Sequence, residues 1–70
     1  MARIIWGNPG NPPNEVSRIL GITRPQLGTA LYRIKRWAGL RGAVRVTIWD
    51  DGSVTDELGS IIGNVYDEID

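Results

Sequence analysis

Three side chains suited to holding RNA alternate along a predicted strand. Arg45, Thr47 and Trp49 alternate with valine and isoleucine residues between positions 44 and 48, and this period of two is typical of a half-buried β-strand. If the aliphatic residues face the core, the other three side chains share the opposite face. An arginine can hold a phosphate, a hydroxyl can hydrogen-bond to a sugar or phosphate, and an indole can stack on a base. We therefore expect this strand face to contact RNA.

Metal-free cleavage of RNA requires activation of the 2′-hydroxyl and stabilisation of the charge that develops on the phosphorane. The chain has no histidine, which excludes imidazole acid–base catalysis. We expect Lys35 and Arg45 to stabilise the charge, Thr47 to bind sugar or phosphate, and Asp56 to act as the base. A structural alternative stays open, in which Trp49 belongs to the core and Arg45 pairs with an acid of the neighbouring hairpin.

The acidic residues of the predicted hairpin do not form a metal-binding pattern. Asp50, Asp51, Asp56 and Glu57 lack the spacing of an EF-hand loop, and Asp51-Gly52 is typical of a hairpin turn. With neither cysteine nor histidine in the chain, the usual zinc sites are excluded. We expect no metal site and no cofactor.

A second hypothesis places duplex DNA on the helical part of the chain. Residues 15–36, EVSRILGITRPQLGTALYRIKR, have the pattern of a helix-turn-helix, with Gly21 at the turn. The second helix would enter the major groove through its N-terminal residues, where Arg24 and Gln26 are suited to contacting base edges. Cations farther along would contact phosphates. Over the RNA and DNA hypotheses together, the predicted nucleic-acid-binding residues are Arg24, Gln26, Arg33, Arg36, Arg41 and Trp49.

Two helices are predicted between residues 14 and 39. Asn14 as N-cap predicts a short helix over 15–20, and Thr23 as N-cap predicts a second one that Gly39 ends. In the second helix the apolar residues Leu27, Ala30, Leu31, Ile34 and Ala38 form one stripe, Gln26, Thr29, Arg33 and Arg36 lie opposite it, and Tyr32 and Lys35 lie on a flank. Gly28 costs this helix about 1 kcal/mol relative to alanine. A close approach by the first helix or by the backbone of a ligand would explain it.

The remaining segments are predicted to be strands and turns. Residues 3–6 have the character of a short strand, whereas the prolines and glycines of 7–13 exclude helix and central strand. After the strand that ends at Trp49, further strands are predicted over 53–56 and 60–66. The predicted fold class is α+β: two short N-terminal helices, helix-turn-helix-like, followed by a three-stranded antiparallel β-meander, with a short N-terminal strand left open. We expect one domain over 1–70, composed of an Asn/Pro/Gly-rich segment (1–13), a helical pair (14–39) and the meander (42–67).

The charges are segregated although the net charge is zero. Residues 16–49 hold seven cations and no acid, whereas residues 50–70 hold seven acids and no cation. This asymmetry favours a polyanionic partner for the basic part, although the two parts could also neutralise each other. No apolar run approaches the roughly 18–20 residues that span a bilayer and no signal-peptide pattern is present, so we expect no membrane partner. A chain this small with no disulfide also makes a homo-oligomer an open expectation.

Two strings extend over nearly the whole chain and resemble the C-terminal toxin modules of bacterial polymorphic toxins of the RHS and contact-dependent-inhibition type. They are GNPGNPPNEVSRILG and TIWDDGSVTDELGSIIGNVYDE, and the second includes the pattern D-G-x-V-x-D…I-G-x-x-Y-D-E. The resemblance implies a nuclease that acts in the cytoplasm of a neighbouring bacterium as the cleaved C-terminus of a secreted toxin. It also implies a cognate immunity protein as partner. Two helices followed by a meander resemble the barnase/EndoU/colicin-like ribonucleases, many of which use a histidine that this chain lacks.

Three functions follow from these patterns. The first is a small metal-independent ribonuclease toxin that cuts tRNA or other RNA. The second is a helix-turn-helix DNA-binding domain without catalytic activity. The third is a non-catalytic protein-interaction module, in which Trp6, Trp37 and Trp49 would face the partner.

Overall fold

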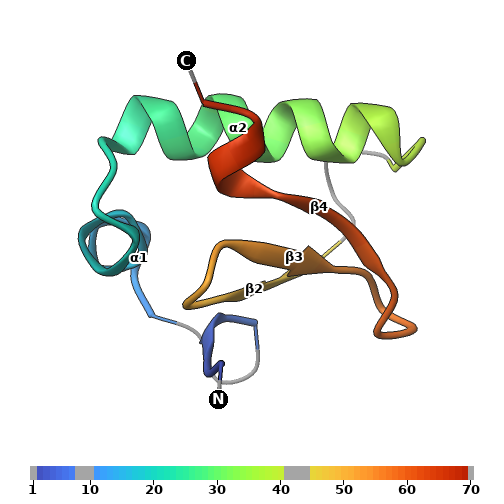
Figure 1. Cartoon of the computed structure of the whole chain (residues 1–70), viewed down its shortest axis with the longest axis horizontal. Helices are drawn as coiled ribbons and strands as arrows, with labels where there is room; N and C mark the ends of the chain where they lie inside the picture. Colours follow the sequence, from blue (N-terminus) through green and yellow to red (C-terminus); the bar gives the residue numbers. More distant parts are fainter. Residues whose placement is uncertain (1, 8–10, 41–44, 70) are drawn as a thin grey trace.

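Two helices and a four-stranded antiparallel sheet make up the fold (Figure 1). The computed structural model describes residues 2–7, 11–40 and 45–69. The elements in chain order are β1 (Ile4–Trp6), α1 (Pro13–Leu20), α2 (Arg24–Trp37), β2 (Thr47–Trp49), β3 (Ser53–Thr55), β4 (Ile61–Asn64) and the 3₁₀ turn η1 (Val65–Asp67). In Figure 1, α2 lies across one side of the sheet and α1 is seen end-on, so the two helices cross steeply. The predicted α+β class is therefore confirmed.

The sheet has the order β1-β2-β3-β4, with every pair antiparallel. The predicted three-stranded meander corresponds to β2, β3 and β4, and the N-terminal strand that the sequence left open is formed as β1 beside β2. Ile4 lies opposite Trp49, and the Asp50 N–H donates to the Arg3 carbonyl at 2.8 Å. A three-residue strand has no periodicity of its own, and only its partner more than forty residues along the chain makes it a strand.

Helix α1 begins at Pro13, earlier than predicted, and the assignment of Asn14 as N-cap was wrong. Pro12 occupies the N-cap position and Pro13 the first turn, where a missing N–H costs no hydrogen bond. The Asn14 carbonyl instead accepts a hydrogen bond from Ser17 Oγ at 2.9 Å. Gly21 ends the helix with a φ of 73°, the left-handed conformation that glycine adopts without a steric penalty.

Helix α2 begins at the predicted cap and ends near the predicted glycine. Thr23 Oγ1 accepts from the Gln26 N–H at 3.2 Å, and Gln26 Oε1 accepts from the Thr23 N–H at 2.9 Å, which is a complete capping box. Gly39 follows the helix with a φ of 72°. The predicted apolar stripe is shorter than expected, because Ala38 is the exposed C-cap and not part of the core.

The core lies between the sheet and the inner faces of the helices. Its buried members are Ile5, Val16, Leu20, Leu27, Ala30, Ile34, Val46, Ile48, Val54 and Val65. Ile48 and Val54 are paired across β2 and β3 and are both fully buried. Helix α2 approaches β4 most closely at Gly63, where a Cβ atom would lie 2.9 Å from Ile34 Cγ1. Glycine at this position lets the helix pack directly on the strand backbone.

The strands are shorter than predicted at several ends. β2 begins at Thr47, whereas the predicted start at residue 44 lies outside the described residues. β3 ends at Thr55, and the last predicted strand, over 60–66, is wrong at its C-terminal end. Beyond Asn64 the backbone turns into η1, because Asn64 Oδ1 accepts from the Tyr66 N–H at 2.9 Å and caps the turn.

The C-terminal turn η1 connects the sheet to both helices. Val65 is fully buried in the core, and its N–H donates to the Gly52 carbonyl at 2.8 Å. Tyr66 Oη donates to the Leu20 carbonyl at the end of α1 at 2.6 Å. The residues after η1 reach α2, where Arg33 Nη1 donates to the Glu68 carbonyl at 3.0 Å.

The β2–β3 hairpin turns at Asp51-Gly52, as predicted. The Ser53 N–H donates to Asp51 Oδ1 at 2.9 Å, and this bond lowers the pKa of the Asp51 carboxyl. Gly52 has a φ of 90°, and a Cβ atom there would lie 2.6 Å from Tyr66 Cδ2. A side chain at Gly52 is therefore disfavoured for two reasons: the positive φ strains it, and its Cβ atom would overlap the Tyr66 ring. Among the described residues, no helix has the length and apolar character needed to cross a membrane.

We predict that Gly52→Ala destabilises the fold more than Gly59→Ala. Both glycines have a positive φ, 90° and 83°, but a Cβ atom at Gly59 would meet nothing within 4 Å. Gly59→Ala should therefore lower the free energy of unfolding by the conformational cost alone, about 1–2 kcal/mol. Gly52→Ala should lower it by about a further 1–3 kcal/mol, because the methyl group overlaps Tyr66. Urea unfolding followed by circular dichroism measures both, and equal losses would contradict the packing described for Tyr66.

Candidate nucleic-acid interface

The structure does not gather the four residues predicted to cut RNA into one pocket. Lys35 lines a depression on α2, Arg45 lines a pocket beside β1, and Asp56 lines a depression at the β3–β4 turn. Thr47 lies on β2 next to Gly7, where a Cβ atom would be 3.2 Å from the Thr47 hydroxyl. The structure therefore does not bring the predicted base into the same pocket as either of the cations predicted to stabilise the charge.

The predicted site residues Asp56 and Trp49 make hydrogen bonds that support the β-sheet and its turns. Asp56 Oδ1 accepts from the N–H groups of Leu58 at 2.9 Å and Ser60 at 3.0 Å, so this carboxylate holds the β3–β4 turn. The half-buried Trp49 donates from Nε1 to the Thr55 hydroxyl at 3.1 Å. The only polar atom of the indole is therefore bonded within the sheet.

One flank of α2 is covered by the C-terminal segment. Arg33 is half-buried there and bonds to the Glu68 carbonyl, so it does not lie among the exposed residues opposite the apolar stripe as predicted. Gln26 lines a small depression on this flank together with Glu68, and its side-chain oxygen is occupied by the capping box. Figure 1 shows η1 and the following residues lying against α2.

The other flank of α2 carries a depression with cationic, aromatic and apolar walls. We call it the α2 depression; it is lined by Gly28, Leu31, Tyr32, Lys35, Arg36 and Leu40. Tyr32 is 65% exposed and Arg36 is exposed, whereas Lys35 is half-buried. Arg24 lies one helical turn before Gly28 and is also exposed. A cationic line thus follows this flank over about 16 Å of helix between Arg24 and Lys35.

Gly28 opens the floor of the α2 depression. A Cβ atom built on Gly28 would meet nothing within 4 Å, so the first helix does not require a glycine there. Packing by α1 therefore does not explain this helix-weakening residue. The open surface lets a bound chain approach the helix main chain.

The α2 depression has the groups that a single nucleic-acid strand needs. Lysine and arginine side chains neutralise phosphates, and an exposed tyrosine ring offers a surface on which a base can stack. At one end, Leu40 also borders the depression that contains Asp56 and Glu57. A polyanion would therefore be repelled at this end and favoured toward Arg24.

Sequence reasoning selected only part of this interface. It selected Arg24, Lys35 and Arg36, but it did not include Tyr32 or Leu40. The spacing of Tyr32 at i+4 from Gly28 and beside the cations was the available signal. Arg41, which was also predicted to bind nucleic acid, lies outside the described residues.

Comparisons with protein-family models, curated proteins and solved structures found no match to this chain. The resemblance to polymorphic-toxin modules therefore stays a prediction. The function therefore has to be inferred from the side chains of the α2 depression.

We predict that Gly28→Ala stabilises the protein by about 1 kcal/mol, because the added methyl group meets open space and alanine favours the helix. In a domain of this size the increase corresponds to a rise in Tm of about 4–8 °C. Thermal unfolding followed by circular dichroism measures it. Gly63→Ala, whose methyl group would overlap Ile34, serves as the control and should lower Tm. A destabilised Gly28→Ala variant would mean that this position is packed.

Proposed function

We propose that this domain binds single-stranded RNA in the α2 depression. The observation that carries the proposal is the gathering of Lys35, Arg36 and Tyr32 around Gly28, whose surface is open. Phosphates would be held by the two cations and a base would stack on the tyrosine ring. Leu31 and Leu40 would pack against the sugar or the edge of the base.

A single strand fits this surface better than the major groove of duplex DNA does. A recognition helix reads base edges through its N-terminal residues, but Gln26 at that end is engaged in the capping box. Glu68 also lies on that flank of α2 and would repel the phosphates of a duplex. A single strand needs only the opposite flank and offers unpaired bases for stacking.

The proposal is compatible with a toxin module, as the sequence resemblance implies. A cognate immunity protein would then cover the α2 depression with an acidic surface, because such a partner complements the cations and excludes RNA. Lys35 and Arg36 would be the residues whose substitution weakens that complex most.

Cleavage of the bound RNA stays a separate prediction. Lys35, Arg45 and Asp56 line three different pockets, so we assign the four predicted residues no joint catalytic role. Incubating the purified protein with tRNA in EDTA tests the activity directly. Shortened RNA that disappears with Lys35→Ala would place the reaction at the α2 depression.

We predict that the double variant Lys35→Ala/Arg36→Ala loses most of its affinity for RNA. Fluorescence anisotropy of a labelled oligo(U) measures binding across a range of salt concentrations. The slope of log K against log[salt] should fall in magnitude by about 1.4, since each phosphate contact in a single strand contributes about 0.7. The control is Arg18→Ala on α1, where the arginine pairs with Glu15 at 3.5 Å. If Arg18→Ala loses as much binding free energy per charge removed as the double variant does, the attraction comes from overall charge and not from the α2 depression.

We predict that Gly28→Ala also weakens RNA binding although it stabilises the helix. The methyl group would hold the strand away from the floor of the depression, so the affinity should fall by about tenfold, as expected for one lost close contact. The same anisotropy assay measures this effect. Affinity that is unchanged in a stabilised Gly28→Ala variant would show that RNA does not approach the helix backbone.

A further inference from the structure

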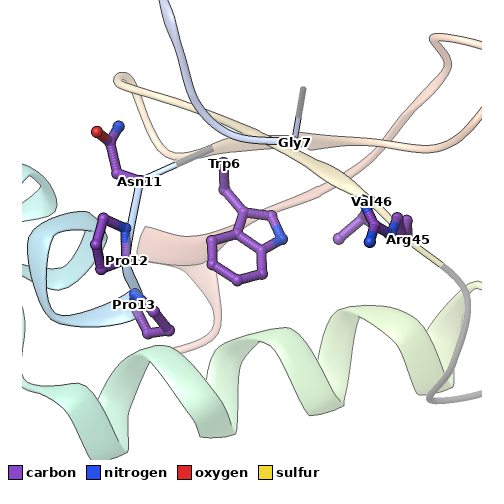
Figure 2. A pocket seen from close by; sticks show the side chains of 7 residues that line it. All are labelled: Trp6, Gly7, Asn11, Pro12, Pro13, Arg45 and Val46. Atoms are coloured by element: carbon purple, nitrogen blue, oxygen red, sulfur yellow. The ribbon is translucent and has the colours of Figure 1, made fainter. Parts of the chain in front are cut away.

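A second pocket lies between β1, the start of α1 and the residues that precede β2. It is lined by Trp6, Gly7, Asn11, Pro12, Pro13, Arg45 and Val46. Figure 2 shows the Trp6 indole near the centre of this group, with the two prolines on one side and Arg45 with Val46 on the other. We call it the Trp6 pocket. It does not share a lining residue with the α2 depression.

The indole N–H of Trp6 has no hydrogen-bond partner among the described residues. Its side chain is half-buried, and its indole N–H meets no acceptor among the described residues, whereas Trp49 donates to the Thr55 hydroxyl. Among the described residues, no buried side-chain nitrogen or oxygen lacks a partner. Figure 2 shows the nitrogen edge of the indole turned toward Val46 and Arg45.

Arg45 supplies a cation beside that donor. Its side chain is exposed and makes no ion pair with the described residues, which leaves the predicted pairing with Asp50 or Glu57 unformed. No carboxylate lines the Trp6 pocket among the residues that the structure describes. Among the described lining residues, Arg45 is the only charged group, and its charge favours an anion.

The rest of the wall consists of apolar side chains and one asparagine amide that is hydrogen-bonded to the main chain. Pro12 and Pro13 are fixed by the start of α1, and Val46 is buried in the core. Asn11 is held in place by a bond from its Nδ2 to the Ile5 carbonyl at 2.9 Å. Pockets of this kind, mostly apolar with a few polar groups that fix orientation, are typical of small-molecule sites. Because the wall is held by the core, binding would need little rearrangement.

We infer that the Trp6 pocket binds a nucleoside monophosphate unit. The base would lie against the indole and the prolines, with a base or sugar oxygen accepting from Trp6 Nε1, and the phosphate would pair with the Arg45 guanidinium. The ligand is either a free nucleotide or one residue of a longer strand, because both present the same base and phosphate. This site is separate from the α2 depression, so it stands whether or not RNA binds there.

The test follows the indole N–H resonances of the three tryptophans by heteronuclear NMR while AMP is added. The Trp6 resonance should shift in a saturable way. The Trp49 resonance should stay, because its N–H is bonded within the sheet, and the largely exposed Trp37 lies elsewhere, on α2. Trp6→Phe identifies the Trp6 resonance.

Arg45→Ala should weaken binding by about tenfold or more, since it removes a charge-assisted contact. Adenosine should bind more weakly than AMP for the same reason, and inorganic phosphate alone should not reproduce the full shift.

Several outcomes would overturn the inference. They are an unmoved Trp6 resonance at saturating AMP, equal shifts of all three indoles, and unchanged affinity in Arg45→Ala. Repeating the titration with oligo(U) in the Lys35→Ala/Arg36→Ala variant separates this site from the proposed function. A Trp6 shift that persists with AMP but not with oligo(U) assigns a free nucleotide, whereas a shift with both assigns a unit of an RNA strand. If Arg45→Ala abolishes oligo(U) binding and Lys35→Ala/Arg36→Ala does not, the α2 proposal is wrong. The Trp6 pocket would then be the RNA-binding site.

Discussion

The contacts of Tyr66 hold the separate parts of this small domain together. Its hydroxyl donates to the Leu20 carbonyl at the end of α1, and its ring fills the space that a Cβ atom on Gly52 would occupy. The preceding residue, Val65, is buried in the core and bonds to Gly52. With no disulfide available to a chain of 70 residues, these nonlocal contacts connect the first helix, the hairpin and the C-terminal turn. The orientation of α2 depends on them, because Arg33 is bound to the same segment.

The position of the C-terminal segment gives the segregated charges a spatial meaning. Glu68 lines a depression on one flank of α2, and its main-chain carbonyl accepts a hydrogen bond from Arg33. The opposite flank holds Lys35 and Arg36. The basic and acidic parts of the sequence therefore meet on one flank of α2, but the described acidic residues do not cover the cations on the other flank. One side of the helix is covered by the protein itself, and the other offers a cationic surface whose field favours a polyanion.

Local signals predicted both helices except for the start of α1, and they were insufficient for the ends of the sheet. The capping box at Thr23 and the glycines at 21 and 39 specify their own backbone geometry, and the structure confirms them. β1 exists only through its pairing with β2, and η1 forms because Asn64 caps a turn, so neither has a periodic pattern in the sequence. The same limit applies to the candidate site. The cations of α2 were visible in the sequence, but the separation of Asp56 from Lys35 depends on how the hairpin turns back, which no spacing along the chain encodes.

The pairing of β1 with β2 also has a consequence for the order of folding. Both helices form from contacts within a few residues, whereas β1 must find a partner strand more than forty positions away. Closing so large a loop costs entropy before the strand contacts compensate for it. We therefore expect the helices and the β2–β3 hairpin to form early and β1 to dock late. The Trp6 pocket, whose walls come from both ends of that loop, would then be completed in the last step of folding.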